Sequence, residues 1–153
     1  MRRALWFAIK FVALTAPLTW LWIAGGRELY ASYFVPIADA IYDLLGVEGA
    51  RGYSWRERYI NYVPFAALVL LTPSLGARRR AVGLAAGLLA IFASHVLFNG
   101  IAQHGAEDFA TMPTALSIAS DSLPFLLWAI IARDFVRDVA RRVIAPPRSS
   151  EGP

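Results

Sequence analysis

The sequence contains no cysteine, and the common hydrolase and nucleotide-binding motifs are also missing. Without cysteine there are no disulfides, no thiolate metal sites and no cysteine nucleophile. There is no HExxH, no phosphate-binding glycine loop and no GxSxG, and no serine motif pairs with a distal histidine as in rhomboid proteases. The sequence therefore predicts neither a metal nor another cofactor, and it favours a non-enzymatic protein while leaving enzymatic activity uncertain.

The dominant feature of the chain is its apolar content, with 58% hydrophobic residues among 153. These residues gather in four stretches, 4–24, 59–75, 81–102 and 115–132. A membrane span takes roughly 20 apolar residues, so each stretch is long enough or nearly so. We therefore expect an all-α integral membrane bundle of four transmembrane helices, forming a single domain over residues 1–145. The tail, residues 146–153, is expected to be disordered.

Arginines cluster on alternate sides of these stretches. They stand before the first (Arg2, Arg3), between the second and third (Arg78, Arg79, Arg80) and after the fourth (Arg133, Arg137, Arg141, Arg142). The segment 103–114 contains no Lys or Arg, whereas the segment 27–58 has arginines mixed with acidic residues. By the positive-inside rule, this distribution predicts a multi-pass protein of the cell inner membrane with both termini in the cytoplasm. Arginines placed at span ends also argue against a nucleic-acid partner.

Residues 27–45 form an amphipathic pattern between the first two spans. Leu29, Tyr33, Ile37 and Ile41 recur at helical spacing, and acidic residues lie on another face of the same helix. We expect an outward-facing helix that lies on the membrane surface or caps the bundle. A second amphipathic helix, over residues 135–144, is expected along the inner leaflet.

A stripe of small residues runs along the third span. Gly83, Gly87, Ala90 and Ser94 follow one another at steps of four and three residues. Small residues at this spacing allow close approach of another helix. The stripe predicts packing within the bundle, or a contact with a membrane protein partner or a second copy of the chain.

Two ionisable residues lie deep within predicted spans, where each costs roughly 2.5–3.5 kcal/mol. At a rise of about 1.5 Å per residue, His95 and Asp121 are both roughly 10 Å from the outer ends of their spans. Asn99 lies one turn above His95, and Arg58 stands at the mouth of the second span. One interpretation is a His95–Asp121 hydrogen bond that fixes helix packing. The other is an outward-facing functional site with His95, Asp121, Asn99 and Arg58 as candidate residues.

The stretch RYINYVPF stands at residues 58–65. Thr72-Pro73, three arginines and a glycine-rich span follow it. Together these segments resemble the small membrane proteins that accompany exosortases. Exosortases are membrane transpeptidases that use a Cys, an Arg and a His. The resemblance offers Arg58 and His95 for the last two roles, but the chain has no cysteine. It therefore implies an accessory protein or a degenerate relative, and not a working transpeptidase.

These observations predict a non-enzymatic accessory or assembly protein that acts through a membrane partner, in envelope protein sorting or secretion. The alternative is a small membrane enzyme or proton-coupled carrier that uses His95 and Asp121. Besides the lipid bilayer, we expect the partner to be another membrane protein or a second copy of this chain.

Overall fold

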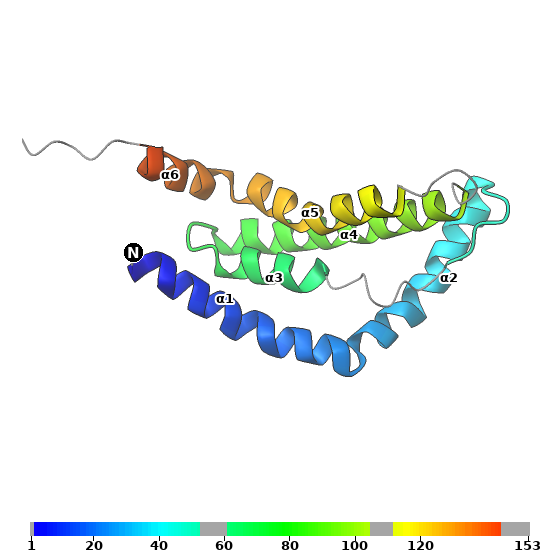
Figure 1. The fold of residues 1–153 in the computed structure, drawn as a ribbon, viewed down its shortest axis with the longest axis horizontal. Coiled ribbons are helices and arrows are strands. Elements are labelled where there is room, and N and C mark those ends of the chain that lie inside the picture. Colours follow the sequence, from blue (N-terminus) through cyan, green and yellow to red (C-terminus); the bar gives the residue numbers. More distant parts are fainter. Residues whose placement is uncertain (1, 53–60, 105–111, 145–153) are drawn as a thin grey trace, which may run out of the picture.

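The computed structural model describes residues 2–52, 61–104 and 112–144, and within these ranges every regular element is a helix (Figure 1). The elements are α1 (Arg2–Leu21), the π-helical turn η1 (Trp22–Gly26), α2 (Arg27–Leu45), α3 (Tyr62–Leu71), α4 (Ala77–His104), α5 (Met112–Ile131) and α6 (Arg133–Ile144). The predicted all-helical fold is confirmed. The predicted tail, 146–153, lies outside the described residues.

Two helical stretches are long and apolar enough to cross a membrane, which indicates a membrane protein. They are Leu5–Leu45, which includes the turn η1, and Ala77–Gln103. The apolar helices Tyr62–Leu71 and Ile118–Ile131 are shorter. Helix α3 ends before the predicted boundary because Pro73 disfavours helical geometry in the residue before it. Thr72 is accordingly extended, with φ −69° and ψ 112°.

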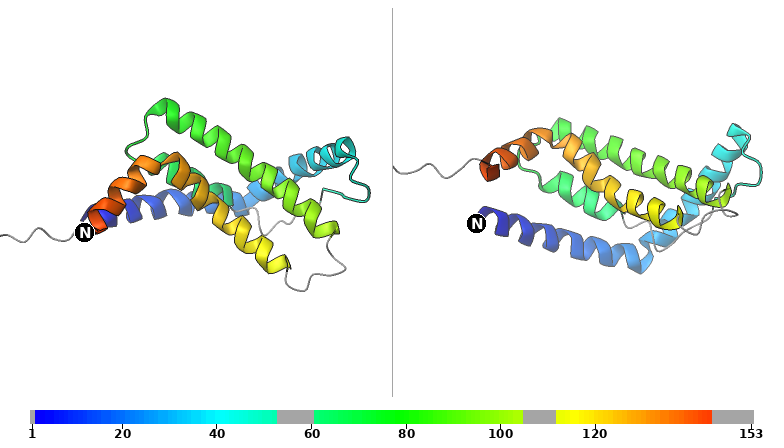
Figure 2. Two further views of the ribbon diagram at one scale, coloured as in Figure 1. Left: turned by 90° about the horizontal axis from the view of Figure 1, so that it is seen from above. Right: turned by 45° about the horizontal axis from the view of Figure 1, so that its top comes forward.

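The helices form a bundle with a distinct set of segments at each end (Figures 1 and 2). The start of α1, the turn between α3 and α4, and helix α6 lie at one end. Helix α2 lies at the other end, near the end of α4. Within the bundle α3 is central, because it packs against α1, α4 and α5, and α4 also packs against α5.

Helix α2 carries two apolar faces, where the sequence analysis found one. The predicted apolar residues Leu29, Tyr33 and Ile37 are exposed, as expected of residues in contact with lipid. The buried face comprises Ala31, Phe34, Ala38 and Tyr42, again at helical spacing. With Ala50 and Val96 of α4, part of this face forms a core at the α2 end of the molecule. Asp39 joins α2 to the segment that follows it, because its Oδ1 accepts a hydrogen bond of 2.5 Å from the Gly52 N–H.

A second core lies where α3 meets α4 and α5, built on Phe65, Val69, Leu75 and Ile91. The small-residue stripe of α4 faces this core. A Cβ at Gly87 would lie 1.9 Å from Cζ of Phe65, and one at Gly83 would lie 2.8 Å from Cγ2 of Ile131. These glycines thus allow α3 and α5 to approach α4 closely, which is the intramolecular use of such a stripe.

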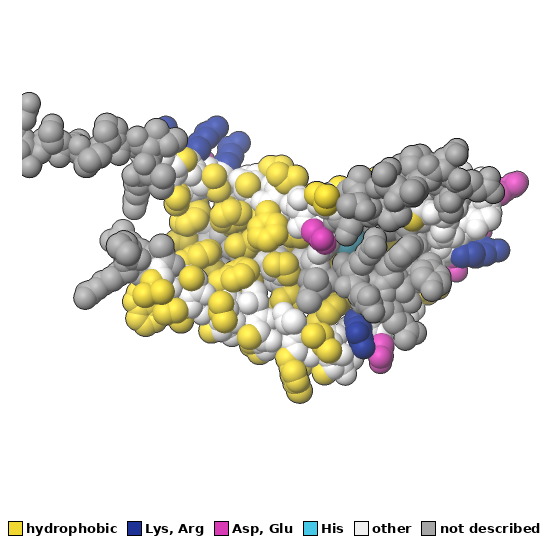
Figure 3. Space-filling view, in the orientation of Figure 1, with side chains coloured by type: hydrophobic (Ala, Val, Ile, Leu, Met, Phe, Trp, Pro, Cys, Tyr) yellow, Lys and Arg dark blue, Asp and Glu magenta, His cyan; other side chains and the backbone are white. Residues whose placement is uncertain are grey.

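The outer surface is covered by apolar side chains. Figure 3 shows a broad band of hydrophobic side chains across one face, with most charged side chains toward its two ends. Large exposed hydrophobic residues include Trp6, Val12 and Ile130, which are 61%, 61% and 69% exposed. Monomeric soluble proteins rarely expose apolar patches of this extent. The surface therefore fits a lipid environment.

Candidate functional site

The most prominent polar feature of the interior is a hydrogen-bonded chain through three side chains from three helices. The Tyr62 hydroxyl on α3 donates to the Tyr30 hydroxyl on α2 at 3.0 Å. The Tyr30 oxygen lies 2.9 Å from Nδ1 of His95 on α4. The Tyr30 hydroxyl and Nδ1 of His95 share one proton in this bond, and the tautomer of the imidazole ring decides which of the two donates. The chain therefore joins α2, α3 and α4 at one point.

Aromatic rings surround this chain. The Tyr30 ring lies 5.7 Å from Trp22 and 6.3 Å from Phe92, centroid to centroid, and the Tyr62 ring lies edge-on to His95 at 5.4 Å. Such geometries each contribute about 0.5–1.5 kcal/mol beyond burial. His95 is only 4% exposed. A buried imidazole held between rings is well placed to fix the positions of helices.

The predicted partner of His95 was Asp121, and the described residues include no hydrogen bond between them. Asp121 lies on the exposed face of α5, whereas His95 is bonded to Tyr30. Equal depth in neighbouring spans does not bring side chains together, because depth leaves the rotation of each helix undetermined. Helix α4 turns His95 toward α2 and α3. Arg58, the candidate at the mouth of the second span, lies outside the described residues.

Asn99, the fourth candidate, fixes the chain that follows α2. Its Nδ2 donates to the Tyr42 hydroxyl at 3.0 Å and to the Arg51 carbonyl at 2.9 Å. The Tyr42 hydroxyl in turn donates to the Val96 carbonyl at 2.6 Å. Gln103 adds a bond from its side-chain amide to the same Arg51 carbonyl. Asn99 is thus occupied in attaching α2 and its following loop to α4.

Two further polar contacts join helices elsewhere in the bundle. Asn61, just before α3, donates through Nδ2 to the Ser120 carbonyl at 3.0 Å and to its hydroxyl at 2.9 Å. Toward the other end, Trp128 Nε1 on α5 donates to the Thr72 hydroxyl at 2.9 Å. Each contact satisfies a buried polar group and joins α3 to α5.

Neither Tyr30 nor Tyr62 was among the site residues predicted from the sequence. A signal for Tyr30 was present, because it adjoins the buried series Ala31, Phe34, Ala38 and Tyr42. That second apolar face predicts a helix packed on both sides, and a tyrosine at its border needs a hydroxyl partner.

The described residues contain no group of three or more His, Cys, Asp or Glu that could hold a metal ion. Comparison of the chain with protein-family models, with curated proteins and with solved structures gives no match.

Proposed function

We propose that this chain is a non-enzymatic accessory or assembly protein of the cell inner membrane, which acts through a membrane partner in envelope protein sorting or secretion. The observation that carries the proposal is that interior polar side chains form hydrogen bonds between helices. Tyr30, Tyr62 and His95 join three helices, and Asn99 and Asn61 join others. Polar groups engaged in this way stabilise a bundle, and they support a scaffold more than a reaction centre.

In the proposed topology α1, α3, α4 and α5 cross the membrane, α2 caps the outer end, and both termini are cytoplasmic. Support comes from the gathering of basic segments at one end, where the start of α1, the α3–α4 turn and α6 lie together (Figure 1). A reporter fused at Gly76 should be cytoplasmic and one fused at Gly49 should be external. Reporter signals on the same side at both sites would contradict this topology.

The surface proposed for the partner is the outer stripe of α1. Leu5, Ile9 and Val12 are 62%, 48% and 61% exposed and share one face of the helix, whereas Gly83 and Gly87 already lie against the chain's own Ile131 and Phe65. A helix with apolar residues at steps of four and three presents a seam for a second helix.

Crosslinking in living cells tests this surface. A photo-crosslinking residue at Ile9 should capture a second membrane protein. The same residue at Leu14, which is half-buried, is the matched control and should capture none. Equal yields from the two positions would contradict the proposed surface. The exosortase resemblance makes a membrane transpeptidase the first partner to look for.

A second candidate function is a small enzyme or proton-coupled carrier centred on His95. The specific observation in its favour is that Tyr62, Tyr30 and His95 form a continuous chain of exchangeable protons with links of 3.0 and 2.9 Å. Intramembrane histidines in such chains are a known feature of proton relays.

A set of substitutions separates the two functions. His95→Leu alone removes one hydrogen bond of the Tyr30 hydroxyl, and the loss of a buried hydrogen bond in this way costs about 1–3 kcal/mol. Adding Tyr30→Phe and Tyr62→Phe removes both hydroxyls of the chain, so the triple variant should recover stability. If the protein is a scaffold, the triple variant should also retain its co-purifying partner and complement a deletion strain. A stable triple variant that keeps its partner but fails to complement would favour the enzyme or carrier.

A further inference from the structure

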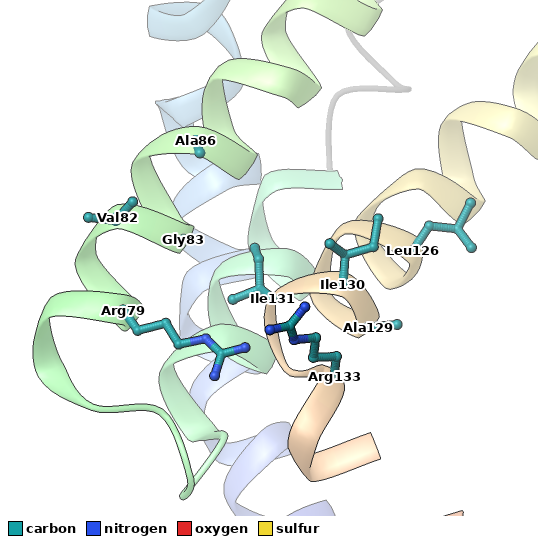
Figure 4. Close-up of a pocket in the computed structure, with 9 residues that line it drawn as sticks. All are labelled: Arg79, Val82, Gly83, Ala86, Leu126, Ala129, Ile130, Ile131 and Arg133. Atoms are coloured by element: carbon teal, nitrogen blue, oxygen red, sulfur yellow. The ribbon is translucent and has the colours of Figure 1, made fainter. Parts of the chain in front are cut away.

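An apolar groove of about 720 Å³ runs between α4 and α5 (Figure 4). Val82, Gly83 and Ala86 line it from α4, and Leu126 and Ile130 line it from α5. Its volume lies within the range of about 300–1,000 Å³ that is typical of ligand pockets. The α4 side is built from small residues, so the groove is a slot between two helices.

Two arginines stand at one end of this slot, on the side of the α3–α4 turn and α6. Arg79 comes from the first turns of α4, and Arg133 is the first residue of α6. In Figure 4 both guanidinium groups extend toward the space between the helices. The slot is therefore apolar along its length and positively charged at one mouth.

The carboxylate of Asp134 shares this mouth. Its Oδ2 accepts a hydrogen bond of 2.7 Å from Arg79 Nη1, and its Oδ1 lies 3.8 Å from Arg133 Nε. The bond from Arg79 lowers the pKa of Asp134 below its usual value of 3.8, so the carboxylate is charged at neutral pH. One carboxylate offsets one of the two cations, and each guanidinium has five N–H donors. Donors and one net positive charge therefore remain.

We propose that this groove binds an anionic phospholipid, with an acyl chain along the α4–α5 slot and the phosphate between Arg79 and Arg133. Basic pockets between membrane helices on the cytoplasmic side are suited to such headgroups. A second copy of the chain fits poorly, because a two-fold interface would place this charged mouth against or beside its own equivalent. The inference requires only that the bundle be embedded in a membrane, and it is independent of the partner proposed above.

The test uses the purified full-length protein in mild detergent, without any partner. Binding of palmitoyl-oleoyl phosphatidylglycerol is compared with binding of the phosphatidylcholine that has the same chains, by native mass spectrometry over a lipid titration. We expect tighter binding of phosphatidylglycerol. Arg79→Gln and Arg133→Gln should each weaken that binding about fivefold, since a basic residue near anionic lipid contributes about 1 kcal/mol. Asp134→Asn removes the competing carboxylate and should strengthen it.

Matched control variants distinguish an effect at this site from a general effect of charge or of side-chain size. Arg51→Gln removes an exposed arginine paired with Asp43 at the other end of the bundle, and it should leave lipid binding unchanged. Ala86→Phe fills the slot and should weaken binding, whereas Ala85→Phe, on the exposed surface of α4 outside the groove, should not. Equal binding of the two lipids, or equal effects of Arg79→Gln and Arg51→Gln, would overturn the proposal. It would also fail if Ala86→Phe altered only the oligomeric state, because a second copy would then be the occupant.

Discussion

The contact between Gly87 and Phe65 offers the sharpest test of how α3 and α4 pack. In the structure the Phe65 ring is fully buried, and it fills the space above Gly87 where a side chain would begin. A Cβ at position 87 would lie 1.9 Å from Cζ and 2.6 Å from Cε1 of that ring. Gly87→Ala is thus the smallest change that forces the two helices apart.

The cost of Gly87→Ala follows from these distances. Non-bonded carbons pack best at about 3.5–4.0 Å, so the ring or the whole of α3 must retreat by well over an ångström. Overpacking of this kind costs typically 1–3 kcal/mol. Alanine regains up to about 1 kcal/mol over glycine within a helix. We therefore expect a net loss of roughly 1–2 kcal/mol in the free energy of unfolding.

The assay is unfolding of the purified protein in mixed micelles, followed by circular dichroism. Gly76→Ala is the control, because a Cβ there meets nothing within 4 Å, and it should stay within about 0.5 kcal/mol of the wild type. Phe65→Leu combined with Gly87→Ala should lose less than the sum of the single losses. If Gly87→Ala were as stable as Gly76→Ala but lost a partner, the stripe would serve association and the packing argument would be refuted.

Further predictions concern the end of the molecule that carries α6. Trp128→Phe keeps an aromatic side chain but deletes the indole N–H that donates to Thr72, and we expect thermal unfolding in detergent to show a loss of about 0.5–1.5 kcal/mol, with a smaller loss if Thr72 is already Val. Because the pKa of Asp134 is lowered when folded, its bond from Arg79 stabilises the protein above the usual value of 3.8 and is lost as pH falls through the lowered pKa. Wild type should therefore lose more stability than Asp134→Asn between about pH 5 and pH 2, and parallel losses would contradict this ion pair.

Much of the fold could be predicted because lipid restricts the choices. Apolar length and arginine placement located α4, the turn before it and the basic segment at α6, and these stand where they were expected. The first apolar stretch was expected to end at residue 24, and the chain bends there through the π-helical turn Trp22–Gly26. Helix α3 is shorter than its apolar stretch because Pro73 ends the helical geometry at Thr72.

The arrangement around His95 could not be predicted, because the sequence alone does not give the rotation of a helix about its axis. Depth along the spans suggested Asp121, whereas the observed partner is Tyr30, from a helix expected to lie on the membrane surface or to cap the bundle. The second apolar face of α2 was also overlooked, since a single amphipathic face already accounted for Leu29, Tyr33 and Ile37. Long-range pairing across 65 residues has no local sequence signal.

The burial of α2 against α4 has a consequence for biogenesis. Phe34, Ala38 and Tyr42 are made early, but Val96 and Asn99, which complete their surroundings, are made some fifty residues later. Until α4 is made, this face of α2 therefore stays uncovered. It closes only once α4 lies against α2, because only then does Asn99 reach the Arg51 carbonyl. Chains truncated before α4 should keep this surface open and be recognised by membrane quality-control proteases.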